Sequence, residues 1–304
     1  MKLEPTRPLI AAPASGWRVG WFAIRPRTLS LAVAPVVLGS ALAWADGAAP
    51  HWLAFAAAIA CALLIQIGTN LHNDVADFKR GTDSPERIGP LRVTAAGWVR
   101  PATMERASVA SFGAALLLGV YLVEVGGWPI LLAGIASLAA GWCYSGGPWP
   151  ISRGAWGEVF VLVFFGLVAV VGSHWLQAGV AMLDAWLGGL ALGLPAAGVL
   201  LVNNYRDLED DLRSGRRTLV ARLGRERARV AYAVLMLLPA LPVVLLAARG
   251  RPGALLALAL LPWMLRLVRS LGAQAPGPWL NLQLASSAKV GSLLGLLLAA
   301  GVLL

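Results

Sequence analysis

Charged side chains are scarce in this sequence: only 13% of its 304 residues are Asp, Glu, Lys or Arg, and 58% are hydrophobic. A soluble domain usually carries about a quarter of charged residues, and the mean hydropathy here is +0.72. These values exclude a soluble globular protein and indicate an integral membrane protein. The formal net charge is +10, and in a membrane protein a basic surplus normally marks cytoplasmic loops and anionic headgroups.

Several reactive motifs are absent. The two cysteines, Cys61 and Cys143, have no Cys or His at ligand spacing, and their apolar settings indicate buried free thiols. There is no Walker loop, no Ser-His-Asp order and no aromatic-and-basic nucleic-acid motif. The N-terminus lacks a short hydrophobic core followed by a small-residue cleavage site, so we expect it to be retained.

Long apolar runs dominate the chain instead. A helix needs about 20 mostly apolar residues to cross a bilayer. This criterion predicts nine spans, at 28–45, 51–72, 104–124, 128–145, 156–175, 186–204, 228–248, 253–272 and 284–304. The runs lack strand-like alternation, so helices are favoured over a barrel. We predict an all-α integral membrane protein with about nine transmembrane helices, in which residues 1–304 form a single polytopic domain.

Basic residues alternate between the predicted connections. Three connections contain no Lys or Arg: 46–50, 125–127 and 176–185. In contrast, residues 73–107 contain six and residues 205–229 contain eight. The positive-inside rule then places the N-terminal segment 1–20 on the cytoplasmic side of the membrane, together with two loops expected to be catalytic, 73–103 and 205–227. We expect this membrane to be a bacterial inner membrane. An odd number of spans places the C-terminus outside.

Asn and Asp side chains gather at the ends of two predicted spans, and all but Asp83 are spaced four residues apart, so that on a helix they share one face; Asp83 joins them if the chain turns at Gly81. The candidate metal ligands are Asn73, Asp77 and Asp83 in the first motif and Asn203, Asp207 and Asp211 in the second. Their hard oxygens suit Mg²⁺, which binds through one or two carboxylates plus substrate phosphates. We predict that two ions hold one diphosphate between the motifs. Merely solvated helix-end acids are disfavoured, because ionisable groups at a membrane span are usually functional.

Basic side chains near these acids could neutralise a diphosphate, with Arg offering bidentate contacts. The candidate catalytic residues are Asp77, Asp207, Lys79, Arg206 and Tyr144. The candidate substrate-binding residues are Asn73, Asn203, Arg80, Arg92, Arg153 and Arg217. For each Arg the alternative of a topological anchor stays open, and Tyr144 could equally be an interfacial aromatic.

Asn70 through Asp83 resembles the first aspartate-rich motif of the UbiA superfamily of intramembrane prenyltransferases. Its Asp-x5-Asp form is that of the 1,4-dihydroxy-2-naphthoate polyprenyltransferase branch. Asn203 through Leu219 resembles the second motif of this branch, and Gly89-Pro90-Leu91-Arg92 and Tyr144-Ser145-Gly146-Gly147-Pro148 also match it. Arg216 stands where many relatives are expected to have Lys.

The resemblance implies a bundle around a central cavity that opens to the cytoplasm and to lipid. It implies Mg²⁺-dependent transfer of a polyprenyl group from polyprenyl diphosphate to 1,4-dihydroxy-2-naphthoate, with loss of CO₂, to give demethylmenaquinone. Two alternatives stay open. One is prenylation of 4-hydroxybenzoate or another aromatic acceptor, and the other is a cation-coupled transporter, which would bind near the bilayer midplane. Prenyl length and oligomeric state are left open.

Overall fold

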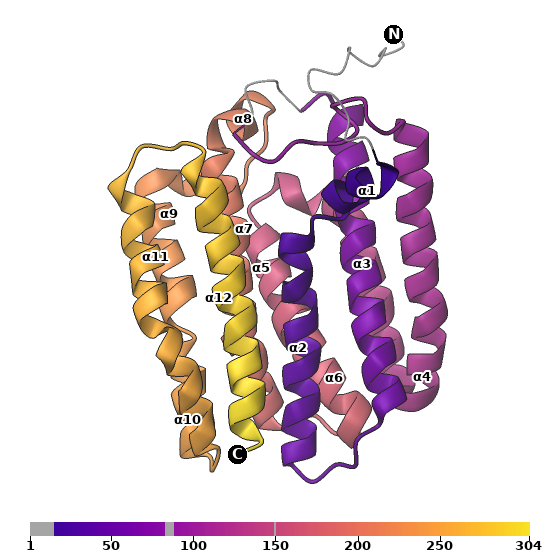
Figure 1. The fold of residues 1–304 in the computed structure, drawn as a ribbon, viewed down its shortest axis with the longest axis vertical. Coiled ribbons are helices and arrows are strands. Elements are labelled where there is room, and N and C mark those ends of the chain that lie inside the picture. The colour runs from indigo at the N-terminus through magenta and orange to yellow at the C-terminus, as the bar shows by residue number, and fades with distance from the viewer. Residues whose placement is uncertain (1–14, 83–87, 149) are drawn as a thin grey trace.

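The protein is an all-helical bundle over the part of the chain that the structure describes. This structure is a computed structural model, and it describes residues 15–82, 88–148 and 150–304. The long helices lie side by side along one direction (Figure 1). Eight helical stretches in the described residues are long and apolar enough to cross a membrane. This confirms the prediction of a helical, multi-pass membrane protein.

Most of the helices follow one another with short connections, whereas residues 80–100 separate α3 from α4. In chain order they are α1 (Gly16–Ile24), α2 (Pro26–Ala45), α3 (Trp52–Lys79), α4 (Pro101–Ser145), α5 (Gly157–Val161), α6 (Ala169–Ala178), α7 (Leu183–Arg206), α8 (Leu208–Arg213), α9 (Leu219–Leu237), α10 (Ala240–Ala248), α11 (Leu261–Ala273) and α12 (Trp279–Val302). Between them lie η1 (Ile151–Arg153), the π-helix η2 (Leu162–Val168) and the 3₁₀ stretch η3 (Pro252–Leu260). One crossing is made by α5, η2 and α6 together, another by α9 and α10, and another by η3 and α11.

The helix α4 makes two crossings, because the chain folds back at Gly127. This glycine has φ 69° and ψ −157°, which are not helical backbone angles. The rings of Phe112 and Trp142 have centroids 6.0 Å apart, whereas thirty residues of straight helix would span about 45 Å. Counting α4 twice gives nine crossings in the described residues, in agreement with the prediction. Accordingly, α1 and the C-terminal end of α12 lie at opposite ends of the bundle (Figure 1).

The predicted catalytic loops are partly helical, which corrects their boundaries. Helix α3 continues to Lys79, although the sequence predicts a loop from residue 73. The helix continues because its last polar side chains have partners inside the protein. Asp74, for example, accepts hydrogen bonds from the backbone N–H groups of Val93 at 3.2 Å and Thr94 at 3.0 Å. The second loop likewise contains α8 and the start of α9, which is interrupted at Gly224.

Small residues let α7 and the π-helix η2 approach closely. A Cβ atom on Gly166 would lie 2.4 Å from the carbonyl oxygen of Gly189, and one on Gly193 would lie 2.5 Å from that of Leu162. No side chain fits at either position, and such small-residue contacts are a common way to pack membrane helices. This contact fixes the beginning of α5 beside the end of α7.

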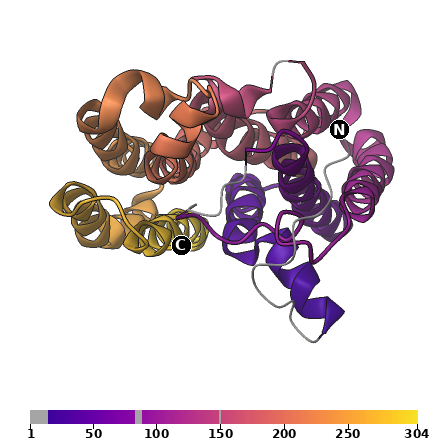
Figure 2. The same cartoon turned by 90° about the horizontal axis from the view of Figure 1, so that it is seen from above.

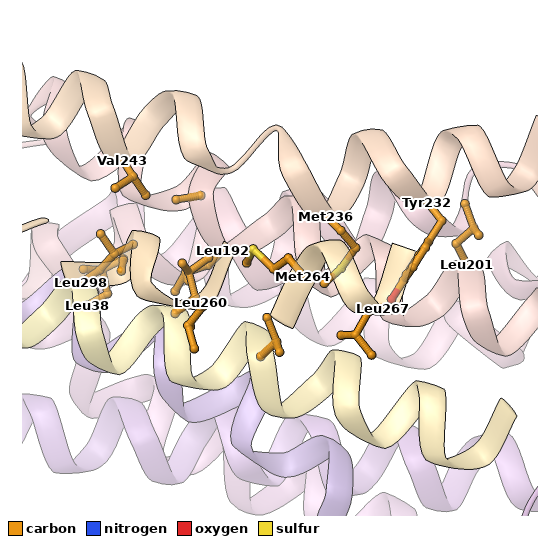
Figure 3. Packing of buried hydrophobic residues seen from close by; sticks show 14 of the residues in the cluster. Leu38, Leu192, Leu201, Tyr232, Met236, Val243, Leu260, Met264, Leu267 and Leu298 are labelled. Atoms are coloured by element: carbon orange, nitrogen blue, oxygen red, sulfur yellow. The ribbon is translucent and has the colours of Figure 1, made fainter. Parts of the chain in front are cut away.

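An apolar core fills the half of the bundle formed by α7, α9, α10, η3, α11 and α12. Figure 3 shows Leu201, Tyr232, Met236 and Leu267 pointing toward one another between these helices. The hydroxyl of the fully buried Tyr232 lies 2.7 Å from Ser287 Oγ, so this polar atom is satisfied. Outside this core, Cys61 is half-buried and Cys143 is exposed, so the prediction of buried thiols was wrong for Cys143.

Ion pairs join the helices at the end of the bundle opposite to α1. His174 is fully buried, and its Nε2 lies 3.0 Å from Asp46 Oδ2. Asp46 also pairs with Arg251, whose Nε lies 3.5 Å from Asp184 Oδ2. Asp184 Oδ1 in turn accepts a hydrogen bond from Arg249 Nε at 2.5 Å. We call these five residues the far-end cluster, and it links α2, α6 and α7 to the connection between α10 and η3.

Candidate active site

A cavity of about 1090 Å³ lies between the helices. Apolar side chains such as Leu122, Phe164 and Val199 line most of it. Its polar lining gathers where α3 and α7 end, at Asn73, Arg92, Asn203, Asn204, Arg206, Asp207, Arg216 and Asn281. The helix α1 lies across this same end of the bundle (Figures 1 and 2). This end is therefore the polar mouth of an otherwise apolar cavity.

Two guanidinium groups hold the first acidic motif. Asp77 is 2% exposed, and its Oδ2 accepts a hydrogen bond from Arg92 Nη2 at 2.6 Å. Its other oxygen pairs with Arg216. Asn73 lies one helical turn earlier, and its Oδ1 accepts hydrogen bonds from Arg92 and, at 3.3 Å, from Arg25. The predicted Asn73/Asp77 face therefore exists, and it points into a ring of arginines.

The second motif is organised around Arg206. Its Nε donates to Asp207 Oδ1 at 2.6 Å and its Nη2 donates to Asp207 Oδ2 at 2.8 Å, which makes a bidentate pair. The same Nη2 reaches Asn203 Oδ1 at 2.8 Å, and Nη1 reaches Asn281 Oδ1 at 3.0 Å. Arg206 is only 2% exposed, so these contacts fix the side chains of the motif.

The two motifs meet through Arg216. Besides pairing with Asp77, its Nη1 lies 3.5 Å from Asp211 Oδ1. Asp211 is 3% exposed and its Oδ2 also lies 3.5 Å from the Thr218 hydroxyl. The structure thus joins Asp77 and Asp211 through Arg216, which lines the cavity together with Asp207, whereas Asp83 lies outside the described residues.

The carboxylates that could hold a metal are paired with guanidinium groups in this structure. Among the described residues, no group of three or more His, Cys, Asp or Glu side chains is arranged to hold an ion. The donor chemistry nevertheless fits Mg²⁺, because carboxylate and amide oxygens are hard ligands and Mg²⁺ takes its remaining oxygens from water and phosphate. A cation and an anionic substrate that arrive together could exchange with the existing Arg–Asp pairs.

Two of the predicted basic residues lie away from the cavity. Lys79 Nζ bonds to Glu105 Oε2 at 2.8 Å, and the Lys79 side chain is 53% exposed. Arg217 is also exposed. Both side chains lie on the outward-facing side of their segments. The spacing of residues in the sequence did not reveal this orientation.

Two further predicted residues connect loops. Arg153 Nη2 donates to the Ser214 carbonyl at 2.7 Å. Arg80 Nη1 donates to the Ser145 carbonyl at 2.5 Å. Burial lowers the pKa of the Arg80 guanidinium, and the charge of Asp77 opposes that shift. These contacts connect the segment after α3 to the end of α4, and the segment before α5 to the segment after α8.

The turn after α4 supports the first motif. Ser145 Oγ accepts a hydrogen bond from Asn73 Nδ2 at 2.7 Å, and Tyr144 lines the cavity beside it. Arg25 has φ 54° and is the one described non-glycine residue with a positive φ. That strained backbone sits at the mouth, where strain commonly accompanies function.

Sequence reasoning missed two polar residues of this region. Glu158 begins α5 and is 4% exposed. It was the lone acid of the predicted span 156–175, and that alone is a functional signal. Asn281, on α12, bonds to Arg206 and, through Nδ2, to the Ile88 carbonyl at 2.9 Å. It is the one asparagine of the sequence outside the two motifs, and that was the signal available.

A helical bundle whose apolar cavity ends in paired acids and arginines defines an integral membrane protein that binds an amphipathic anion. The sequence profile of the UbiA prenyltransferase family matches residues 32–281. The chain belongs to this family.

Relatives and solved structures agree with that assignment. An Escherichia coli protein named 1,4-dihydroxy-2-naphthoate octaprenyltransferase is 39% identical over 70% of this chain and 71% of its own length. The chicken UbiA prenyltransferase domain-containing protein 1 is 32% identical over 96% of this chain and 88% of its own. The structure of a UbiA homolog from Archaeoglobus fulgidus bound to DMAPP and Mg²⁺ has a TM-score of 0.67 and 16% identity, and it covers 93% of this chain and 98% of that chain.

Proposed function

We propose that this protein transfers a polyprenyl group from polyprenyl diphosphate to 1,4-dihydroxy-2-naphthoate, with loss of CO₂, to give demethylmenaquinol, the hydroquinone form of demethylmenaquinone. The observation that carries the proposal is the cluster of Asp77, Asp207, Arg92, Arg206 and Arg216 at the mouth of an apolar cavity. It is supported by several relatives at 34–39% identity that are named for this acceptor.

The arginines bind the head of the donor. Arg92, Arg206 and Arg216 line the cavity, and their forked donors match diphosphate oxygens. Mg²⁺, held by Asn73, Asp77, Asn203, Asp207 and Asp211, with Asp83 expected to join them, would neutralise charge on the departing diphosphate. When an arginine turns from a carboxylate to a phosphate, that carboxylate becomes available to hold Mg²⁺. The ion would then supply the counter-charge that the arginine had provided, so no buried acid is left unpaired.

The apolar cavity suits the carbon chemistry. The allylic C–O bond breaks, its electron pair leaves with the diphosphate, and the resulting cation lies among apolar and aromatic side chains. Exclusion of water protects the cation from hydrolysis, and the ring of Tyr144 can stabilise it. The ring carbon that carries the carboxylate forms the new C–C bond. The C–CO₂ bond then breaks, its electrons restore the aromatic ring, and CO₂ leaves without any transfer of a proton.

The orientation follows from the charge of the loops. Loops rich in arginine adjoin the cavity mouth, so we infer that this end faces the cytoplasm of a bacterial inner membrane. The polyprenyl tail lies in the apolar part of the cavity, beside the surrounding lipid. The relatives from Bacillus subtilis and Escherichia coli are named for an octaprenyl donor.

A two-acceptor assay tests the proposal. Purified protein receives Mg²⁺, a long polyprenyl diphosphate, and equal amounts of 1,4-dihydroxy-2-naphthoate and 4-hydroxybenzoate, and mass spectrometry identifies the product. Demethylmenaquinol, or the demethylmenaquinone that oxygen in air forms from it, is expected, whereas prenylated 4-hydroxybenzoate alone would establish the other acceptor. Product formation in detergent also distinguishes an enzyme from a gradient-driven transporter. Full activity of the double variant Asp77→Ala, Asp207→Ala would refute the site assignment.

A further inference from the structure

Glu158 is a buried carboxyl that the proposed chemistry does not use. Its Oε1 accepts a hydrogen bond from Asn204 Nδ2 at 2.9 Å. Its Oε2 is buried and has no hydrogen-bond partner among the described residues. Burying such a group in a membrane bundle costs free energy. The contact with Asn204 is therefore the interaction that can explain why this carboxyl is buried here.

The packing of α5 on α7 creates this contact. Gly166 and Gly193 let the two helical stretches approach, as described above. Closer to the mouth, a Cβ atom on Gly157 would lie 3.1 Å from Leu200 Cδ2. Leu200 lies one helical turn before Asn204, so the beginning of α5 rests directly on the part of α7 that leads into the second motif.

The contact with Glu158 determines which way the Asn204 amide points. A carboxamide has a donating NH₂ end and an accepting carbonyl end. The NH₂ end faces the carboxyl of Glu158, so the carbonyl oxygen is turned away from it. Asn204 lines the cavity, and it is adjacent in the chain to Asn203. Its carbonyl oxygen is thus the polar atom that it offers to a ligand there.

A hydrogen-bond acceptor at this position discriminates between the two substrates. Diphosphate and carboxylate oxygens are acceptors, and they would be repelled by an amide carbonyl. A ring hydroxyl is a donor and can bond to it. The acceptor molecule must also lie next to the allylic carbon, hence next to the diphosphate site at Asn203 and Asp207, which adjoins Asn204 on α7.

We propose that Asn204 binds the aromatic acceptor by accepting a hydrogen bond from one of its ring hydroxyls, and that Glu158 is the positioning residue that holds the Asn204 amide in that orientation. The bond orients the ring toward the allylic carbon, and at the 1-hydroxyl, which is ortho to the attacked carbon, it would also increase the electron density there. This inference rests on the proposed function, because the hydroxylated ring supplies the donor.

Steady-state kinetics of the full-length protein in detergent test the pair. Glu158→Leu removes the acceptor for Asn204 Nδ2, so the KM for 1,4-dihydroxy-2-naphthoate should rise about tenfold, the effect of one unmade buried hydrogen bond. The KM for the polyprenyl diphosphate should not change. Glu158→Gln keeps an oxygen that can accept the same bond, so this variant should remain close to wild type.

Methyl ethers of the acceptor identify the bond itself. The 1-methoxy and 4-methoxy monoethers of 1,4-dihydroxy-2-naphthoate are measured as competitive inhibitors. In the wild type, methylation of the recognised hydroxyl should weaken inhibition about tenfold relative to the other ether. In Asn204→Leu the two ethers should inhibit equally, because the group that distinguishes them is gone.

A matched variant controls for lost stability. Ser287→Ala removes the 2.7 Å contact with Tyr232 in the core away from the cavity, and both KM values should stay unchanged. The inference is overturned if Glu158→Leu raises both KM values equally, or if Glu158→Gln is as impaired as Glu158→Leu. A wild-type protein that does not turn over 1,4-dihydroxy-2-naphthoate would refute the proposed function and this inference with it, whereas turnover with unselective variants would refute this inference alone.

Discussion

Arg216 pairs with Asp77 across 139 positions of sequence, and this contact joins the segment after α8 to the end of α3. The same guanidinium lies 3.5 Å from Asp211. One side chain thus connects an acid of the first motif with an acid of the second. The geometry of the cavity mouth depends on it, and the variants below test that dependence.

Arg216→Ala should reduce prenyl transfer by about 100-fold or more, the usual effect of removing a group aimed at developing negative charge. Arg216→Lys should retain part of the activity, because it keeps the charge but loses the fork. The measurement is kcat and the KM for polyprenyl diphosphate. The adjacent and exposed Arg217 provides the control, and Arg217→Ala should behave like wild type. Equal losses at the two positions would contradict the assignment.

Lys79 and Arg92 should differ in the same assay, although both belong to the first loop. Lys79→Ala removes an exposed pair with Glu105, and such pairs contribute about 0–1 kcal/mol. Arg92→Ala leaves Asp77 with one fewer buried partner, so activity should fall by about 100-fold. A Lys79→Ala variant as impaired as Arg92→Ala would restore Lys79 as a catalytic residue.

Asn281→Leu should raise the KM for polyprenyl diphosphate about tenfold, because Arg206 loses an acceptor and the Ile88 carbonyl loses a donor. Donor titrations at saturating acceptor measure the effect. Trp279→Phe, in the first turn of the same helix, removes the hydrogen bond to the Ala275 carbonyl and keeps an aromatic ring against the core, and it serves as the control. An unchanged KM in Asn281→Leu would show that Arg206 is positioned without α12.

Gly166→Leu should destabilise the protein, since a Cβ atom alone would meet the Gly189 carbonyl at 2.4 Å. Overpacking of this kind costs about 1–3 kcal/mol or more, and it should lower the thermal unfolding temperature in detergent. A Cβ atom on Gly113, in contrast, would meet nothing within 4 Å. Gly113→Ala should therefore be neutral, or stabilising by about 0.5–1 kcal/mol. Equal unfolding temperatures for the two variants would argue against the close contact between η2 and α7.

Chelation of divalent ions should abolish prenyl transfer without unfolding the protein. Asp77, Asp207 and Asp211 already have guanidinium partners, so removing a metal leaves no uncompensated buried charge. Activity should return when Mg²⁺ is added in excess of EDTA, and the unfolding temperature should be little affected. Activity that is insensitive to EDTA would contradict the metal proposal, and unfolding on chelation would show that the ion is structural.

The fold was predictable because each membrane span requires a long run of apolar residues, which can be recognised in the sequence. The same criterion placed the end of α3 too early, because it treats polar residues as loop, whereas Asp74 and Asp77 have partners inside the protein. The four-residue spacing predicted that Asn73 and Asp77 share a face of a helix, as their common contact with Arg92 shows, whereas their role as metal ligands stays a prediction. The choice among the arginines was not, because Arg216 and Arg217 are neighbours in sequence and differ only in the direction of their side chains. Glu158 carried a usable signal as a lone acid in a span, but its partner Asn204 could be identified only from the packing of α5 on α7.

The far-end cluster restricts where the bundle can open. Separating α2, α6 and α7 at that end would break the contact of the buried His174 with Asp46 and the contacts of Asp184 with Arg249 and Arg251. At the mouth, the arginines that hold Asp77 and Asp207 can exchange one anionic partner for another, so the helices there can separate while their charges stay compensated. The far-end cluster therefore ties four parts of the chain together at the end of the bundle away from the proposed diphosphate site, and opening the bundle there would expose the fully buried His174 to its surroundings.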